Sequence, residues 1–205
     1  FELLQNEAFD YILLSDQDTI YNHDYVSTFL FELNKLSENN IIAYAPAIYD
    51  KISQKMKHVY MLVNSKIKKV IPKDYCYISH TIASGLIINS SALLIVGGMN
   101  EDLFIDYVDF EWCWKVKNRG FKILYIPNLI INHSLGDAKV CIGNKCIAKR
   151  SSLRYYYIIR NTLFLSKTSN YLTSKEKQQW RIQSIKYIVG YFFLADEKKY
   201  IFRAI

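Results

Sequence analysis

Two aspartates separated by one residue, Asp16 and Asp18, follow the apolar run 11–14 after a single serine. A short apolar run bounded by polar residues predicts a buried strand of a parallel sheet, and open α/β sheets bind ligands beyond the carboxyl ends of their strands. Alternate residues of an extended segment point the same way, so both carboxylates can converge on one ligand. Neighbouring carboxylates repel each other unless a cation or hydroxyl donors satisfy them. The pair therefore predicts a site for a hard divalent ion, Mg²⁺ or Mn²⁺, with capping of the following turn and helix as the structural alternative.

A second acidic cluster alternates with aromatic residues between positions 100 and 112. Asp109 and Glu111 fall near the start of the helical periodicity at 106–119, so stabilisation of exposed helix N–H groups is one interpretation. The other is catalytic, because a carboxylate beside aromatic side chains binds a proton more tightly and can serve as a general base. His133 follows the predicted strand 129–132 and is a third candidate, although a lone histidine is more often structural.

The elements that must position these side chains alternate along the chain. Apolar runs predict strands at 11–14, 41–46, 82–88 and 121–126, and apolar residues at helical spacing predict helices at 25–35, 90–96 and 106–119. Two longer helices are predicted at 151–167 and 174–194. Residues 50–80 predict hairpins or a variable loop, and Cys141 and Cys146 flank a predicted hairpin turn. Strands interleaved with helices over about 130 residues predict an α/β fold.

The composition limits the class of protein. Of 205 residues 51% are hydrophobic and 22% charged, which excludes disordered and fibrous chains. Four cysteines are too few for a disulfide framework, so a reducing compartment is expected. No apolar run approaches the ~18–20 residues of a membrane span.

The positive charge lies at the end of the chain. Residues 145–205 carry 13 basic and 3 acidic residues, against 13 basic and 16 acidic residues before them. A basic, aromatic tail predicts contact with an anionic surface, either lipid headgroups or polyphosphate. The alternative is a solvated basic helical face.

The beginning of the chain predicts a truncated protein. Residue 1 is Phe, and a helix end at 1–7 leads directly into the strand 11–14, as in the second half of a βαβ unit. The strand before that helix is missing from the sequence, and no secretory signal is visible.

Five segments, taken together in this order, resemble the rhamnosyltransferase branch of the family-2 inverting glycosyltransferases, which have the GT-A fold. The segments are D-Q-D at 16–18, T-I-A-S-G at 81–85, G-G-M-N-E-D-L-F-I-D-Y-V-D-F-E-W-C-W-K at 97–115, N-L-I-I-N-H-S-L-G at 128–136 and R-Y-Y-Y-I-I-R-N at 154–161. The resemblance implies an α/β fold of GT-A type: a Rossmann-type mixed sheet flanked by helices, missing its first strands, with a C-terminal helical extension. It divides the chain into a partial catalytic domain at 1–150, without its nucleotide-binding part, and basic aromatic helices at 151–205.

The resemblance also implies roles for individual residues. Asp18 and His133 would bind the metal, and Asp16 would contact the metal or the ribose of the donor. Asp109 would be the base that deprotonates the acceptor hydroxyl, and Glu111 and Trp112 would position acceptor or base. The donor would be contacted by Ser84, Gly85 and Arg160. Arg154 could approach the same diphosphate as Arg160, although a structural salt bridge is an equal alternative for both, and Lys115 stands where the family often has Arg.

The implied function is inverting transfer of a sugar, rhamnose from dTDP-rhamnose, in cell-surface polysaccharide (O-antigen or capsule) biosynthesis. The expected partners are a nucleotide-sugar donor, a lipid-linked or polysaccharide acceptor and an anionic membrane surface, with no nucleic acid. The expected location is cytoplasmic, peripheral on the inner face of the bacterial cell membrane. One alternative is a truncated, non-catalytic remnant of such an enzyme. Another is a metal-dependent phosphatase with Asp16 as nucleophile, which Ile20 disfavours because that motif requires Thr or Val at this position.

Overall fold

The structure is a computed structural model that describes residues 9–51, 53–63, 66–133, 138–142 and 145–205. Its internal contacts divide the chain into two compact units, which are described separately. The first unit comprises Phe1–Met99 and Trp112–Ser134, and the second comprises Asn100–Glu111 and Leu135–Ile205. The expected boundary at residue 150 between functional domains stays a prediction.

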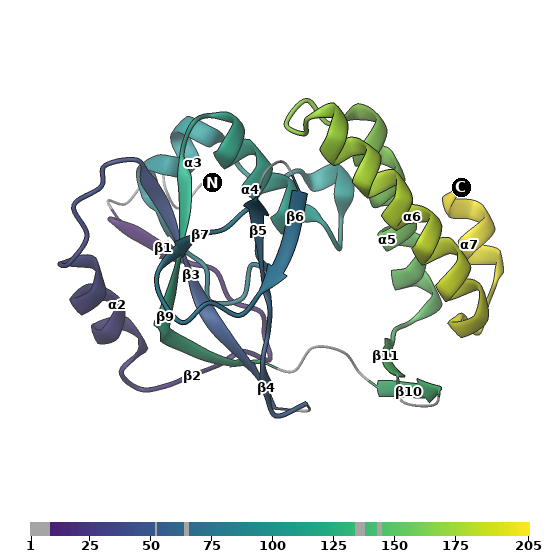
Figure 1. Ribbon diagram of the computed structural model, residues 1–205, viewed down its shortest axis with the longest axis horizontal. Helices are drawn as coiled ribbons and strands as arrows, with labels where there is room; N and C mark the ends of the chain where they lie inside the picture. Colours follow the sequence, from purple (N-terminus) through teal and green to yellow (C-terminus); the bar gives the residue numbers. More distant parts are fainter. Residues whose placement is uncertain (1–8, 52, 64–65, 134–137, 143–144) are drawn as a thin grey trace. The chain divides into compact units, whose positions relative to one another are not determined.

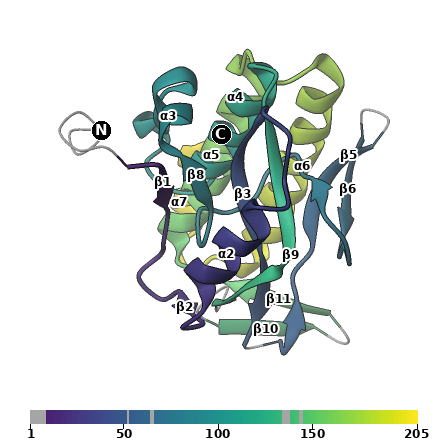
Figure 2. The ribbon, with the colours of Figure 1, turned by 90° about the vertical axis from the view of Figure 1, so that its left-hand side faces the viewer.

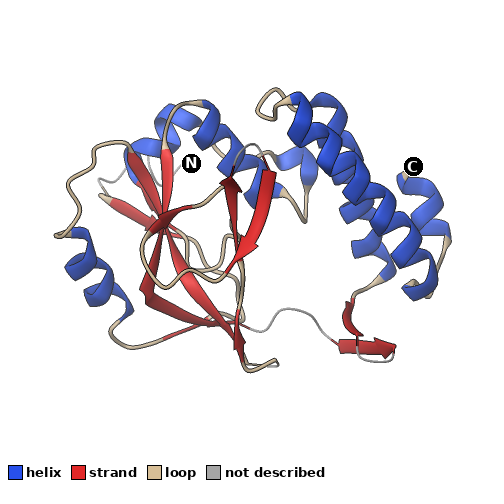
Figure 3. Ribbon diagram, in the orientation of Figure 1, coloured by secondary structure: helices blue, strands red, loops and turns tan. Residues whose placement is uncertain are grey.

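Within the described part of the first unit, seven strands form one mixed sheet (Figures 1 and 3). The strand order is β1-β8-β3-β9-β2, with β4 paired to β3 and β7 paired to β9. Among the described strands, only β3 and β9 pair in parallel, and they form the long, apolar centre of the sheet. A separate antiparallel hairpin consists of β5 and β6. The bounds are β1 Tyr11–Leu13, β2 Ile20–Tyr21, β3 Ile41–Asp50, β4 Lys55–Met56, β5 Val59–Val63, β6 Lys66–Val70, β7 Cys76–Tyr77, β8 Ile87–Asn89 and β9 Lys122–His133.

Helices cover both faces of this sheet. One face is covered by α2 (Tyr25–Leu33), which lies in front of β3 and β9 in Figure 2. Tyr25 and Phe29 of α2 pack there against the larger apolar side chains of β3 and β9. On the other face, α3 (Ser90–Val96) and the C-terminal part of α4 (Val108–Asn118) pack against alanines of β3. Because neighbouring strand residues point to opposite faces, the small side chains can all line one face. The alanines leave room there for the fully buried ring of Trp112.

The second unit consists mainly of helices. Here α5 (Ser152–Thr168), α6 (Ser174–Leu194) and α7 (Lys199–Ala204) share an apolar core, with a short 3₁₀ helix, η1 (Glu101–Leu103), before α4. A capping box of Thr173 and Glu176 starts α6 and satisfies exposed N–H groups of its first turn. The strands β10 (Ala138–Ile142) and β11 (Lys145–Lys149) pair antiparallel with Cys141 opposite Cys146, which confirms the predicted hairpin.

Several sequence predictions agree with the structure. The α/β class is confirmed, and helices occur at all five predicted segments. The bounds of α3 and α6 match the predicted 90–96 and 174–194. The short helix α7 was not predicted.

Strand predictions were less accurate. The segment 11–14, predicted to be a buried parallel strand, is wrong in both respects: β1 lies at the sheet edge, antiparallel to β8, with Leu13 40% exposed. The predicted strand 82–88 is reduced to β8, because a left-handed Gly85 interrupts an extended course. The predicted strands 121–126 and 129–132 are one strand, β9. The predicted helix end at 1–7 and the hairpin turn at 143–144 lie outside the described residues.

No helix among the described residues is long and apolar enough to cross a membrane.

Candidate metal and donor site

Strand pairing brings Asp16, Asp18 and His133 together. The chain leaves β1, passes through both aspartates and returns to the sheet as β2. There β2 pairs antiparallel with the end of β9, so that Ile20 lies opposite Asn132. Asp18 precedes this pair by two residues and His133 follows it by one. The pairing of two strands distant in sequence therefore places an imidazole beside the aspartate loop.

The three side chains form a compact cluster. Their ligand atoms all lie within 4.8 Å of one another. Nε2 of His133 is 3.8 Å from Oδ2 of Asp16, and Nδ1 of His133 is 3.5 Å from Oδ1 of Asp18. The imidazole is only 6% exposed, whereas the two carboxylates are about half exposed, at 51% and 53%. The cluster is thus a buried nitrogen ligand beneath two carboxylates that solvent can reach.

This donor set fits a divalent cation. The buried Nδ1 of His133 makes no hydrogen bond within the described part of the chain, which is unusual for a buried polar atom. A cation would neutralise the mutual repulsion of the carboxylates and use the imidazole lone pair. Oxygen ligands with one imidazole suit Mn²⁺ and are compatible with Mg²⁺. The structure therefore brings together the three predicted metal ligands in a candidate metal site.

The predicted donor residues Ser84 and Gly85 lie against the same strand end. The fully buried hydroxyl of Ser84 donates a hydrogen bond to Oδ2 of Asp16. The backbone N–H of Gly85 donates to the carbonyl of Leu14 at 2.9 Å, and the Gly85 carbonyl accepts from the hydroxyl of Tyr25 at 2.7 Å. These contacts fix the loop beside the carboxylates and orient one of them.

Only glycine suits position 85. Its φ is +75°, in the left-handed region that other residues rarely adopt. A Cβ atom here would lie 2.8 Å from Cγ of Pro46 and 3.0 Å from Cγ2 of Ile131, well inside ordinary contact distance. The loop therefore approaches β3 and β9 more closely than any side chain would allow.

The predicted base, Asp109, lies in the first turn of α4 in the second unit, where it is partly buried. Its Oδ1 accepts a hydrogen bond from the backbone N–H of Phe110 at 2.9 Å. Glu111 is buried, at 3% exposure. The proposed catalytic role of Asp109 and the positioning role of Glu111 stay predictions.

Trp112 has no exposed surface in this structure. Its side chain lies in the core of the first unit, and its Nε1 donates to the carbonyl of Gly97 at 2.9 Å. Direct contact with an acceptor would need exposed ring atoms, so burial leaves positioning as the remaining predicted role. Lys115, which stands at the position of a family arginine, donates to the carbonyl of Gly98 at 3.1 Å.

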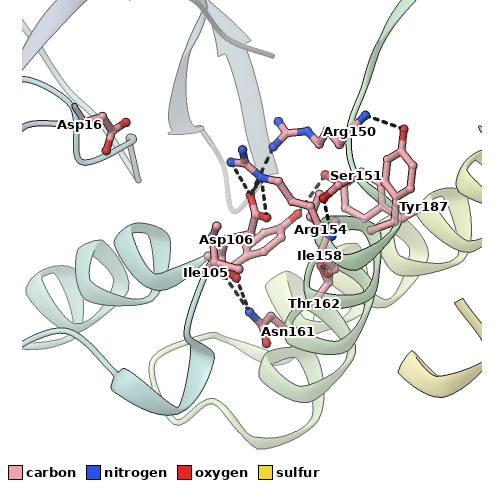
Figure 4. Close-up of polar contacts among 12 residues, drawn as sticks. Asp16, Ile105, Asp106, Arg150, Ser151, Arg154, Ile158, Asn161, Thr162 and Tyr187 are labelled. Carbon is pink, nitrogen blue, oxygen red and sulfur yellow. Dashed lines mark hydrogen bonds and ion pairs between the residues drawn. The ribbon is translucent and has the colours of Figure 1, made fainter. Parts of the chain in front are cut away.

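The two arginines of α5 have different partners, and Figure 4 shows the partner of Arg154. Arg154 forms a forked ion pair with Asp106, at 3.0 Å from Nε to Oδ2 and 3.2 Å from Nη2 to Oδ1. The structure thus shows the salt bridge that was the alternative to a donor role for Arg154. Arg160 donates from Nη1 to the backbone carbonyl of Asp102 at 2.8 Å, and its donor role stays a prediction.

Sequence reasoning gave no role to Tyr25 or Asn161, both of which hold site loops. Tyr25 binds the Gly85 carbonyl, and Asn161 binds three carbonyls before α4. Asn161 ends the segment R-Y-Y-Y-I-I-R-N and is fully buried. The signal that could have identified it was a polar amide among the apolar residues of a predicted helix. Nothing in the sequence distinguishes Tyr25 from the other tyrosines.

Comparison with known proteins gives one related sequence and a shared fold. The chain is 31% identical over 163 residues to the dTDP-rhamnosyl transferase RfbF of Shigella flexneri, covering 75% of this chain. The chain spans about half the length of this relative, 52%. No protein-family model matches the chain.

Two solved structures share the architecture. The mannosyltransferase PcManGT of Pyrobaculum calidifontis, in complex with GDP-Man and Mn²⁺, superposes with a TM-score of 0.51 at 9% identity, over 99% of this chain and 51% of its own. TarS of S. aureus superposes with a TM-score of 0.51 at 12% identity, over 94% of this chain and 30% of its own. At such low identity the likeness concerns the fold alone, and it confirms the GT-A architecture.

Proposed function

We propose that this chain, which has the GT-A glycosyltransferase fold and is similar in sequence to a dTDP-rhamnosyl transferase, is the metal-binding and catalytic part of a sugar transferase. The donor would be a nucleotide sugar, dTDP-rhamnose, and the product would be a glycoside with inverted anomeric configuration. The single observation that carries the proposal is the Asp16, Asp18 and His133 cluster in a chain that is 31% identical to such a transferase.

The donor diphosphate would bind to this cluster through a divalent ion. Asp16, Asp18 and His133 would hold Mg²⁺ or Mn²⁺, and the bound ion would neutralise charge on the diphosphate leaving group. Ser84 restrains Asp16, so its hydroxyl helps to fix the orientation of one ligand. Gly85 lets the Ser84–Gly85 loop lie close to Pro46 and Ile131, and this loop would contact the donor sugar.

The reaction we propose is a single displacement. Asp109 accepts the proton of the acceptor hydroxyl while the acceptor oxygen bonds to the anomeric carbon. The bond between that carbon and the diphosphate oxygen breaks, and dTDP leaves with the electron pair. One displacement at the anomeric carbon gives inversion. The charge is balanced because the departing diphosphate gains the negative charge that the deprotonated acceptor brings.

We further propose that the acceptor is a lipid-linked saccharide and that α6 rests on an anionic membrane surface. Ile182, Ile185, Val189 and Phe193 recur at a spacing of three or four residues and are 48–78% exposed. This spacing puts them on one face of a helix. Lys175 and Lys186 are exposed on or beside the same face. An apolar stripe with flanking lysines is the composition of a helix that lies in a lipid headgroup layer.

The test is release of dTDP from dTDP-rhamnose by the full-length protein, with water as acceptor. The wild-type protein should bind the donor and release dTDP only in the presence of Mn²⁺ or Mg²⁺. Asp109→Asn should lower the rate by about 100-fold or more, with donor affinity unchanged within about threefold, because the base acts on the acceptor side. Asp102→Asn, an exposed carboxylate in the same segment, is the matched control and should retain wild-type activity.

Full activity of Asp109→Asn would show that the base assignment is wrong. Metal-dependent donor binding without turnover in the wild-type protein would instead favour a non-catalytic remnant.

A further inference from the structure

The turn that leads into α4 has an energetically unfavourable backbone conformation. Phe104, Asp106 and Tyr107 all have positive φ, at 61°, 62° and 68°, although none of them is glycine. Phe104 has ψ −64°, and the N–H of Ile105 donates a hydrogen bond to the carbonyl of Leu103 at 2.7 Å. Together these features define a γ-turn of the rare, strained form. Such residues persist only where surrounding contacts over-determine them. This turn, residues 104–107, ends one residue before α4 and two before Asp109.

Asn161 of α5 holds the backbone of turn 104–107 (Figure 4). Its Nδ2 lies 2.9 Å from each of the carbonyl oxygens of Leu103, Ile105 and Asp106. Its Oδ1 accepts from Nη1 of Arg160 at 2.8 Å, which fixes the amide orientation, because carbonyls can only accept. The Asn161 side chain is fully buried. The two N–H groups of this amide are therefore shared among three backbone carbonyls at the strained turn.

Arginines hold the side chain of the same turn. The carboxylate of Asp106 is 13% exposed and receives the fork of Arg154 and a longer contact, 3.4 Å, from Nη1 of Arg150. A forked arginine fixes the direction of a carboxylate as well as its position. Asp106 itself has a left-handed backbone, so the ion pair acts directly on a strained residue.

Tyr107 links the end of the turn to α6. Its hydroxyl hydrogen-bonds that of Tyr187 at 2.9 Å, and its ring meets the edge of Trp180 with centroids 5.4 Å apart. Burial holds the pKa of the Tyr107 hydroxyl well above its usual value, so the group stays protonated. Ile105 and Asp106 are thus held by α5 and Tyr107 by α6, although both helices are distant from the turn in sequence.

We propose that Asn161 and the Arg154–Asp106 ion pair are positioning residues, which hold turn 104–107 so that α4 begins in the orientation that Asp109 needs. This inference rests on the proposed role of Asp109 as base. A turn that served only to connect η1 to α4 would not need three left-handed non-glycine residues. The left-handed conformations set the direction of the first turn of α4, and the hydrogen bonds and ion pair from α5 stabilise these conformations. A displacement of the order of 1 Å at a catalytic group is enough to lower a rate by about 100-fold.

The experiment compares variants of the full-length protein in two measurements. Asn161→Ala should lower kcat for dTDP release by about 100-fold, and Arg154→Gln by about tenfold, with KM for dTDP-rhamnose within about twofold of wild type. Arg154→Lys should recover part of the loss, because it keeps the charge but not the fork. The matched controls are Asn170→Ala and Arg181→Gln, both at exposed positions, which should behave as wild type.

Hydrogen exchange of the backbone amides separates positioning from general stability. Exchange should accelerate at residues 103–111 in Asn161→Ala and remain unchanged in β3 and β9. A folded Asn161→Ala protein with wild-type kcat, or with unchanged exchange at 103–111, would overturn the proposal, as would acceleration spread over the whole chain. If the wild-type protein releases no dTDP, the proposed function fails, and the exchange comparison still decides whether Asn161 holds the turn.

Discussion

The residues of the candidate site differ in how well the sequence reveals them. Asp16, Asp18 and His133 were predicted because carboxylate spacing and strand ends carry a chemical meaning, and a family resemblance joined the histidine to them. The structure brings them within 4.8 Å. Asn161 and Tyr25 could not be assigned, because their roles depend on carbonyls that come near only after folding. A side chain that binds backbone has no partner residue type to look for.

Glu32 is a residue whose charge depends on the fold. This buried carboxylate of α2 accepts hydrogen bonds from Tyr75 and Asn128 and pairs with Lys35, and these contacts hold its pKa below the usual 4.5. Because the folded-state pKa is the lower one, the stabilisation is complete above about pH 4.5 and is lost as the pH falls through the folded-state value. Glu32→Gln should therefore lower the free energy of unfolding by about 1–2 kcal/mol at pH 7.

The measurement is urea unfolding at pH 7 and at pH 4. The difference between wild type and Glu32→Gln should shrink at the lower pH. Glu101→Gln, at an exposed position, serves as the control. If the difference in free energy of unfolding between wild type and Glu32→Gln were equal at both pH values, the charge of Glu32 would not contribute to stability.

At the scale of elements, helices were easier to predict than strands. The bounds of α3 and α6 follow from local periodicity and caps, which are properties of neighbouring residues. The position of β1 at an edge depends instead on which strands pair, and pairing joins residues far apart in sequence. The predicted strand 121–126 stops before Pro127, a residue that commonly ends a strand, but β9 continues past it. The register between β3 and β9 shifts between Ile126 and Ile130, so the proline lies in an irregularity of the ladder.

The close packing of the Ser84–Gly85 loop on the sheet gives an element-level prediction. Gly85→Ala should lower the free energy of unfolding by about 1–3 kcal/mol, because the new Cβ meets Pro46 and Ile131 and the backbone is left-handed. Gly190→Ala is a matched control in α6, where a Cβ meets nothing within 4 Å. It should instead stabilise by about 0.5–1 kcal/mol, as alanine favours a helix.

Urea unfolding measures both changes, and Mn²⁺ titration shows whether Gly85→Ala also disturbs Asp16. A Gly85→Ala protein as stable as wild type would contradict the close approach that the structure gives this loop.

At the scale of the whole molecule, charge and exposed apolar surface both point to the C-terminal helices. The excess of positive charge from residue 145 onward was evident in the sequence. The sequence did not show which apolar residues of α6 are buried and which form the exposed stripe of Ile182, Ile185, Val189 and Phe193. The hydrophobic periodicity of α6 is weak because apolar residues occupy two faces. One face carries Tyr191, which packs in the helical core, and Trp180, which is buried against Tyr107 and Phe110, whereas the other face is exposed.

This surface predicts salt-sensitive binding to anionic vesicles. The full-length protein should sediment with vesicles that contain phosphatidylglycerol and not with phosphatidylcholine alone, and high salt should release it. Phe193→Ser and Lys186→Glu should each weaken binding several-fold. Leu94→Ser, which changes a comparably exposed apolar residue on α3, should not. Binding that resists high salt would contradict the proposed electrostatic attraction to the lipid headgroups. A concentration-dependent dimer that Phe193→Ser abolishes would instead show that the exposed apolar residues of α6 contact a second copy of the chain.

The central claim is that Asp16, Asp18 and His133 hold one divalent cation, and Mn²⁺ titration followed by electron paramagnetic resonance tests it most directly. The wild-type protein should bind one ion at this cluster, and Asp18→Asn and His133→Gln should each weaken binding by at least about tenfold. Asp24→Asn, an exposed aspartate at the start of α2 whose side chain makes no capping hydrogen bond, should leave the affinity unchanged. Wild-type Mn²⁺ affinity in both Asp18→Asn and His133→Gln would contradict the account.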